Sequence, residues 1–482
     1  MRTTALLTLA SFGMAFAATQ AQGQLQPPTT ARPVSLHYTY YTQDDDAAPS
    51  PSDVPPPPVE DAVPDAPMPD TVVPDTAAGA PVVEHGAVAE DVGNGVMAAP
   101  ADDDYDYECE DEGPVRLFNG CGGIDIYGHM SFGIYGNDNG NRSGIGNAPL
   151  GFRNVSDGAT FDQFWLTAEK ALDDCCPSWG FRIDYVFGAD GPDTTAFGDQ
   201  SKFDFRWQSS RDYGSALPQA YAQYGTSDFN VKVGHFYTII GYEVVSAPEN
   251  FFYSHAYTMY YGEPFTHTGI LAERSMMCDQ MTVWAGWTNG WDSYYGDHLD
   301  ASTFLGGASY AVNDCLSVTY ATVWGDHGDG TARGGVPSNA GDIYMHSVVV
   351  DYQINECMQY VFQSDYANNR IAGAHNEWYG VNQYLFYTLS DCYKLGARFE
   401  WFNDADGVRI VNNDAVGTAI GPDVDYYSVT LGLNYTPNNN IILRPEVRWD
   451  WADGGTPFNP NAAGVGTVDD QFYYGMDLIV LF

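Results

Sequence analysis

The stretch Gln471-Phe472-Tyr473-Tyr474-Gly475-Met476-Asp477-Leu478-Ile479-Val480-Leu481-Phe482 presents two different faces when alternate residues are grouped. One face is apolar or aromatic throughout: Phe472, Tyr474, Met476, Leu478, Val480 and Phe482. The other face mixes polar and apolar side chains and includes Asp477. A period of two predicts a β-strand, and this pairing of faces is typical of a strand with lipid on one side and a barrel lumen on the other.

The preceding run, residues 441–451, shows the same alternation with charges. One of its faces is apolar, with Ile441, Leu443, Pro445, Val447, Trp449 and Trp451. A charge facing hydrocarbon at mid-membrane costs about 2–4 kcal/mol, so the charged face must point to water or to other protein groups. We predict that ten charged residues of inward parity line the lumen: Arg182, Asp184, Lys232, Lys394, Arg398, Glu400, Arg444, Glu446, Arg448 and Asp450. They either set a transverse field across a pore or merely hydrogen-bond the inner wall.

Alternating runs of this kind continue back to about residue 123. Sixteen are found, starting near residues 123, 160, 179, 216, 228, 265, 280, 301, 316, 342, 358, 377, 393, 425, 441 and 471. An even number suits a transmembrane antiparallel β-barrel, and sixteen strands are expected to enclose an aqueous channel. Short turns alternate with long connections, which predicts short turns at the periplasmic end and long loops outside.

The N-terminal region has a different composition. Residues 1–21 combine a basic start, a short apolar run and the triplet Ala15-Phe16-Ala17, which predicts a cleaved signal peptide. Residues 22–113 are rich in Pro, Ala and Asp, so we predict a disordered acidic spacer. The β-barrel is expected over residues 114–482.

Composition and charge narrow the partners. Aromatic residues make up 15% of the chain and charged residues 17%, below the roughly 25% charged residues of soluble domains. The net charge is −44, and residues 24–113 hold 20 of the 63 acidic residues. This acidic balance excludes nucleic acid as a binding partner, because phosphate contacts need Lys and Arg. It favours outer-membrane lipid, ions and small solutes as partners, and leaves a homo-oligomer open.

No motif indicates an enzyme, a metal or a cofactor. The sequence contains neither G-x-S-x-G nor H-E-x-x-H, and no Cys/His cluster has zinc spacing. Two acidic stretches, 326–330 and 404–407, are more typical of turns than of calcium loops. We therefore expect no catalytic residues, no bound metal and no cofactor.

Eight cysteines suggest disulfide bonds in an exported chain. Cys176, Cys278, Cys315, Cys357 and Cys392 lie at or beside predicted periplasmic turns, on lumenal parity. Neighbouring turns would place their Cα atoms about 9–10 Å apart, beyond the roughly 7 Å limit for a disulfide. Partners are therefore sought in Cys109, Cys121 and Cys175, or in a neighbouring molecule; the remaining alternative is free thiols.

Residues 238–264 are the predicted constriction loop. The loop is long, aromatic and mildly acidic, and it contains Glu243 and Glu249. Loops of this length in a compact architecture are usually functional or disordered. The sequence leaves open whether this loop folds into the lumen or caps the surface.

Several stretches resemble the OmpL-like β-barrel porin family. They are Gly234-His-Phe-Tyr-Thr-Ile-Ile-Gly-Tyr-Glu243, Ala247-Pro-Glu-Asn-Phe-Phe-Tyr-Ser254, Pro264-Phe-Thr-His-Thr-Gly269, Asn289-Gly-Trp-Asp292 and Arg444-Pro-Glu-Val-Arg448. The resemblance covers roughly residues 120–482 and implies a pore-forming outer-membrane barrel. A terminal Phe on an alternating strand also resembles the sorting signal of such barrels. The family often has Lys at the position of His235, so an implied anion preference is in doubt here.

Two functions remain in view. The first is an outer-membrane porin for passive diffusion of ions and small solutes, exported through the signal peptide. The second is a structural or surface-array protein that a barrel anchors. The acidic charge favours a weak cation preference in the first case.

Overall fold

The structure is a computed structural model. It describes residues 118–119, 123–139, 147, 149–152, 158–173, 176–196, 213–290, 292–294, 301–326, 341–371, 374–410, 422–459 and 466–482. The predicted signal peptide and spacer, with Cys109, Cys121 and Cys175, lie outside these residues. Within them, no helix is long and apolar enough to cross a membrane.

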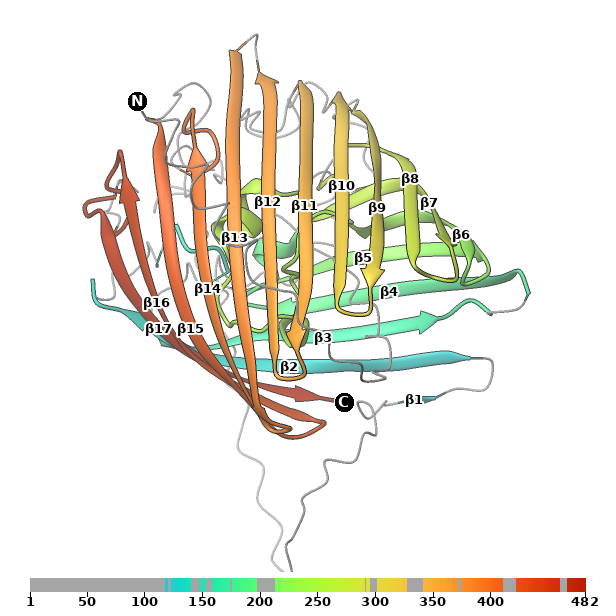
Figure 1. Cartoon of the computed structure of the whole chain (residues 1–482), viewed down its shortest axis with the longest axis horizontal. Helices are drawn as coiled ribbons and strands as arrows, with labels where there is room; N and C mark the ends of the chain where they lie inside the picture. The colour runs from blue at the N-terminus through green and yellow to red at the C-terminus, as the bar shows by residue number, and fades with distance from the viewer. Residues whose placement is uncertain are drawn as a thin grey trace, which may run out of the picture. The chain divides into compact units, whose positions relative to one another are not determined.

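Seventeen strands make up one antiparallel sheet (Figure 1). The first half contains β1 (Phe118–Asn119), β2 (Ile124–Asn137), β3 (Gly158–Lys170), β4 (Ser178–Gly188), β5 (Gly214–Gly225), β6 (Phe229–Tyr237), β7 (Thr266–Met276), β8 (Met281–Thr288) and β9 (Ser302–Asn313). The second half contains β10 (Leu316–Asp326), β11 (Asp342–Asn355), β12 (Met358–Ile371), β13 (Ala374–Ser390), β14 (Tyr393–Asp404), β15 (Val424–Asn438), β16 (Ile441–Asp453) and β17 (Asp470–Leu481).

Strands β2–β17 close into a sixteen-strand barrel, and the predicted fold class is confirmed. Each strand pairs with its neighbour in sequence, and β17 pairs with β2 from Tyr473↔Asn137 to Leu481↔His129. The backbones of Phe482 and Gly128 exchange two further hydrogen bonds at this seam, of 2.8 and 3.0 Å. Closure pairs the two strands that would otherwise be open edges. Every strand of the barrel begins within three residues of its predicted start.

The strand faces follow the predicted alternation. On β17, Phe472 and Tyr474 are exposed on the outer face, whereas Tyr473 and Asp477 are buried on the inner face. Aromatic side chains also stack in pairs on the outer face near both ends of the barrel, as in Tyr427–Trp451 and Tyr393–Tyr435. Aromatic belts at two heights are typical of a barrel wall that spans a bilayer.

The two ends of the barrel differ in their connections. At one end the strands are joined by short turns, such as residues 314–315, 356–357, 391–392 and 439–440. We call this the short-turn end, and the opposite end the long-loop end. The connection that matters most for function starts at the long-loop end, between β6 and β7.

Candidate functional site

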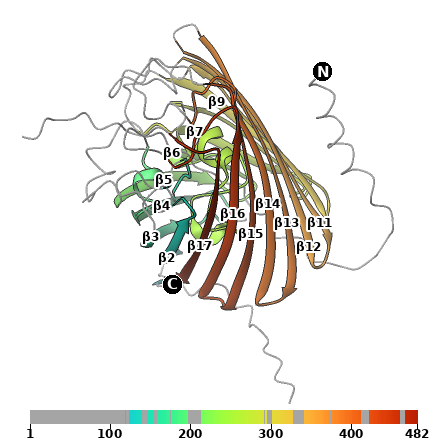
Figure 2. The ribbon, with the colours of Figure 1, turned by 90° about the vertical axis from the view of Figure 1, so that its left-hand side faces the viewer.

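The connection between β6 and β7, residues 238–265, folds into the barrel. We call it the inner loop. It contains the 3-10 turn η2 (Ala247–Glu249) and the π-helical turn η3 (Thr258–Gly262). In Figures 1 and 2 this yellow-green segment lies between the wall formed by β2–β5 and the wall formed by β12–β16. Of the two placements that the sequence left open, the structure shows the lumenal one.

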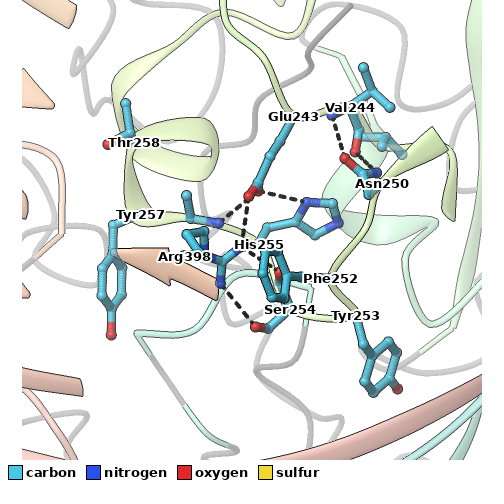
Figure 3. A network of polar contacts seen from close by, with 12 residues as sticks. Glu243, Val244, Asn250, Phe252, Tyr253, Ser254, His255, Tyr257, Thr258 and Arg398 are labelled. Atoms are coloured by element: carbon cyan, nitrogen blue, oxygen red, sulfur yellow. Dashed lines mark hydrogen bonds and ion pairs between the residues drawn. The ribbon is translucent and has the colours of Figure 1, made fainter. Parts of the chain in front are cut away.

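Glu243 holds the centre of the inner loop (Figure 3). Its carboxylate pairs with Arg398 of β14 at 2.6 Å and with His255 at 3.4 Å, and it accepts the N–H of Ala256 at 2.8 Å. Burial alone would raise the pKa of Glu243, but the Arg398 guanidinium and His255 hold that pKa well below its ordinary value. One glutamate thus ties two parts of the loop to the barrel wall.

Two wall glutamates bind the backbone of the loop. Glu446 of β16 accepts the N–H groups of Tyr253 and Ser254 at 2.9 and 3.0 Å. Glu400 of β14 accepts those of Tyr257 and Thr258 at 2.9 and 2.7 Å. Charge-assisted bonds of this kind are about twice as strong as neutral ones.

The wall arginines bind the loop's carbonyl groups. Arg444 donates to the carbonyls of Ala247 and Asn250 at 2.6 Å each and to that of Phe252 at 3.3 Å. Its remaining nitrogens pair with Asp477 of β17 at 2.6 and 2.9 Å. Because Asp477 satisfies one side of the guanidinium, the other side is fixed toward the loop.

Glycines on the inner face make room for loop side chains. A Cβ at Gly396 would lie 2.2 Å from the Phe251 ring, and one at Gly380 would lie 2.4 Å from Thr258. A Cβ at Gly133 would overlap the hydroxyl of Tyr253. Glycine normally weakens a strand, so its placement at inward positions marks where another segment approaches closely.

Aromatic packing fills the interior around the inner loop. Tyr253, Tyr257 and Tyr260 belong to one buried apolar cluster that reaches inner-face residues of many strands, including Val323 and Met345. The space between the inner loop and these parts of the wall is packed rather than water-filled. The reason is that the inner loop supplies large rings to inner-face positions that are themselves apolar.

The ten charged residues predicted to line the lumen divide into two groups. Seven are buried: Asp184, Arg398, Glu400, Arg444, Glu446, Arg448 and Asp450. Six of them bind the inner loop or one another; Arg448, for example, binds the carbonyl of His255 and the carboxylate of Asp450. Asp184 instead accepts bonds from Thr167, Gln219 and Arg182. The remaining three, Arg182, Lys232 and Lys394, are partly exposed.

The three partly exposed cations lie nearer the short-turn end, each with a polar partner. Lys232 pairs with Glu273 at 3.8 Å, and both side chains are 16% exposed. Arg182 pairs with Asp184 and Glu169, and Lys394 donates to Gln359 at 3.4 Å. Glu249, in the part of the loop that contacts Arg444, is exposed, unlike Glu243. We call the part of the lumen around Arg182, Lys232, Lys394 and Glu249 the open half. The part that is packed around the rest of the inner loop is the filled half.

The charges of β14 and β16 converge across β15. Arg398 donates to Thr430 at 3.1 Å, and Arg448 lies 4.0 Å from Glu400.

Sequence reasoning did not select Gln163 and Asp477, which also hold the loop. Gln163 donates to the carbonyl of Val245 at 2.7 Å and accepts the N–H of Ala247. The inward parity of Asp477 was the available signal.

The short turns repeat one arrangement around the cysteines. Asn313 and Asn355 accept the N–H groups of Cys315 and Cys357 through their side chains, at 2.9 and 3.0 Å. Among the described residues, Cys278, Cys315 and Cys357 form no disulfide. Cys176, Cys278 and Cys357 are exposed, and Cys315 and Cys392 partly so. The predicted pairing with Cys109, Cys121 or Cys175 lies outside the described residues.

The structure also shows the strand face of His235 and the bonding partners of Asp404. His235 shares its strand face with Val233, which is 53% exposed on the outer side, so His235 does not provide a lumenal charge. Asp404 accepts the N–H groups of Val408, Arg409 and Ile410, which is turn chemistry. No group of three or more metal-ligating side chains occurs in the described part of the chain.

A closed, even-stranded antiparallel barrel with a charged inner wall and an inward-folded loop defines a transmembrane barrel of the porin class. The family model described as "Putative beta-barrel porin-2, OmpL-like" matches residues 123–482, and the chain belongs to this family. The predicted family is thereby confirmed. No curated protein matches the sequence.

Solved structures similar to this chain include three outer-membrane proteins. The channel DcaP of Acinetobacter baumannii is 13% identical, with 76% of this chain and 99% of that chain covered and a TM-score of 0.49. An anion-selective porin from Comamonas acidovorans is 10% identical, with 74% and 99% covered and a TM-score of 0.49. OmpT of Vibrio cholerae, in a trimer form, is 13% identical, with 74% and 99% covered and a TM-score of 0.44.

Proposed function

We propose that this porin provides passive diffusion of ions and small solutes across the outer membrane, with the inner loop as its constriction. One observation carries the proposal: the inner wall keeps partly exposed charges in the open half, while the inner loop occupies the filled half. A solute entering at the short-turn end meets charged side chains first and the loop next. The chemistry is permeation, with no covalent step and no cofactor.

The orientation and assembly follow from the same proposal. The short-turn end faces the periplasm and the long loops face outward, after export through the signal peptide at residues 1–21. The barrel extends over residues 114–482, following a disordered spacer at 22–113. Disulfides between the turn cysteines and Cys109, Cys121 or Cys175 would tie the entering segment to the periplasmic rim. A homo-oligomer in the membrane is part of this proposal.

The open half favours cations. Arg182, Lys232 and Lys394 each have an acidic or amide partner, and the exposed Glu249 adds a further carboxylate near Arg182. A carboxylate in a confined passage concentrates cations locally. The protein outside residues 24–113 and Arg2 adds to this, with 43 acidic and 17 basic residues, a net charge of −26.

The test is a reversal potential across a planar bilayer with a salt gradient at low ionic strength. We expect a modest cation preference that Glu249→Gln reduces. Glu243→Asp, which keeps the buried charge, is the matched control and should leave the sign of the preference unchanged. Clear anion selectivity of the wild-type protein would overturn the preference.

The packed interior of the filled half supports a second candidate, a barrel that only anchors surface loops and the acidic spacer. Planar-bilayer recording separates the two candidates. Discrete conductance steps from pure, folded protein support the porin. Their absence, with folding confirmed by the mobility shift of unheated protein on a gel, supports the anchor.

A further inference from the structure

The wall of the filled half binds the inner loop mainly through the loop's backbone. From Phe252 to Thr258, every residue except Ala256 has a backbone N–H or carbonyl group bonded to a charged wall side chain. The N–H of Ala256 is bound by Glu243 of the loop itself. Backbone groups are common to all peptides, and side-chain bonds of Tyr253 to Asp162, Ser254 to Arg398 and Thr258 to Glu400 add to this recognition.

The wall residues are arranged as alternating acceptors and donors. Glu446 and Glu400 each bind two consecutive N–H groups, and the carbonyls on either side go to Arg444, Arg398 and Arg448. A carboxylate that spans two neighbouring N–H groups, flanked by guanidinium groups on carbonyls, is complementary to a peptide main chain. All five residues are buried at 5% exposure or less, where such bonds are strongest.

The contacts between the wall and the aromatic rings of the loop are also unspecific in their chemistry. Gly396 and Gly432 lie opposite each other on β14 and β15, and the rings of Phe251 and Phe252 contact these two positions. The Arg398 guanidinium lies 4.9 Å from the centre of the Phe252 ring. Ring-sized space lined by glycine and a cation accommodates any aromatic side chain.

We propose that the inner wall of β14–β16 is a peptide-binding site, which residues 251–258 of this chain occupy as an internal ligand. Its ligands are short peptides that carry aromatic residues. When the inner loop is displaced, such a peptide takes the loop's place and blocks the lumen. The inference rests on the proposed channel and names a class of ligand for its lumen. The alternative, in which the wall only anchors the loop, is an outcome of the test.

The experiment uses the full chain and a capped synthetic peptide of sequence Phe-Phe-Tyr-Ser-His-Ala-Tyr-Thr, matching residues 251–258. In the wild-type protein the tethered loop competes at an effective concentration of about millimolar, so we expect little binding of added peptide. The variant Phe251→Ser/Phe252→Ser empties the ring-sized space but keeps every wall residue. We expect this variant to conduct more than wild type and to be blocked by the peptide.

Adding Glu446→Gln to that variant should weaken peptide binding about tenfold or more, because one charged acceptor of two N–H groups is lost. Lys394→Gln, outside the peptide's contacts, is the matched control and should leave binding unchanged. Fluorescence anisotropy of labelled peptide on detergent-solubilised protein measures binding without reference to current. A scrambled peptide of the same composition should bind less tightly through its altered aromatic positions.

The outcomes are separable. If the loop variant is folded but binds no peptide, or if Glu446→Gln leaves binding unchanged, the peptide site is overturned. If peptide binds in the anisotropy assay while neither protein conducts, the channel proposal fails and the peptide site stands. If Phe251→Ser/Phe252→Ser does not fold, the single variant Phe251→Ser, which also keeps every wall residue, takes its place with the same expectations.

Discussion

The filled half and the open half of the lumen use charged residues in opposite ways. In the filled half, Glu243 and Arg398 meet at 2.6 Å with almost no exposure, inside a shell of aromatic rings. In the open half, Lys232 and Glu273 lie 3.8 Å apart, partly exposed. Breaking a buried pair costs about 3–5 kcal/mol, whereas exposed pairs contribute about 0–1 kcal/mol. The same residue types therefore hold a loop in one region and, in the proposed channel, face the passing solutes in the other.

The largest contrast is expected from removing one wall cation in each half. Arg444→Leu should dislodge the inner loop, because three carbonyls and Asp477 lose a charged donor. We expect a loss of about 3–5 kcal/mol in the free energy of unfolding and a higher single-channel conductance. Urea-induced unfolding and planar-bilayer recording measure the two effects.

The control is Lys394→Leu in the open half. Because this side chain is partly exposed and donates one long bond to Gln359, its loss should change stability by less than about 1 kcal/mol. Equal losses in the two variants would mean that the distinction between the halves is wrong.

A double-mutant cycle in each half sharpens the comparison. The coupling between Glu243 and Arg398 should be several-fold larger than that between Lys232 and Glu273, for which we expect about 1 kcal/mol or less. Salt should screen only the second coupling, since buried pairs are screened much less. Comparable coupling energies, or equal salt dependence, would contradict the assignment of the two regions.

The strand pattern was predictable from sequence, while the loop contacts were not. The alternation of Arg444 and Glu446 with apolar residues placed both on the inner face, because a charge cannot face hydrocarbon cheaply. That rule cannot tell a water-exposed inner charge from one bound to a loop. The pairing of Glu243 with Arg398 spans 155 positions and depends on how the loop folds back.

Two signals in the sequence were nevertheless available. Val231 and Val233 alternate with Lys232, which already places His235 on the outer face despite the resemblance to a family with Lys there. Glycine at inward positions such as Gly396 and Gly432 indicates space for another segment. Interpreting those glycines would have favoured the lumenal loop over the surface cap.

A smaller effect is expected from the two facing glycines. A Cβ at Gly396 would lie 2.2 Å from the Phe251 ring, and one at Gly432 would lie 3.2 Å from the Phe252 ring. Gly396→Ala should therefore destabilise by about 1–3 kcal/mol through overpacking, and Gly432→Ala by less. Both are paired directly on β14 and β15, so strand propensity is matched. The reverse order in thermal or urea unfolding would show that the rings are not held as described.

The smallest expected effect is a difference in acid response between two glutamates of the inner loop. Arg398 and His255 hold the pKa of Glu243 below its ordinary value of 4.5, against the opposing effect of burial. Its stabilising contribution is therefore complete above about pH 4.5 and declines as the pH falls further, by at most about 1.4 kcal/mol per pH unit. Desolvation inside the barrel raises the pKa of Glu249, against the opposing effect of the Arg182 charge, although the side chain is exposed. Its contribution has the opposite sign, because stability declines as the pH rises from 4.5 through the raised pKa. Glu243→Gln should thus reduce the loss of unfolding free energy below about pH 4.5, as measured by urea unfolding at different pH values. Glu249→Gln should reduce the loss of unfolding free energy as the pH rises above that value. If both variants change the pH dependence of stability in the same direction, the two carboxylates lie in similar environments. That result would contradict the buried ion pair of Glu243.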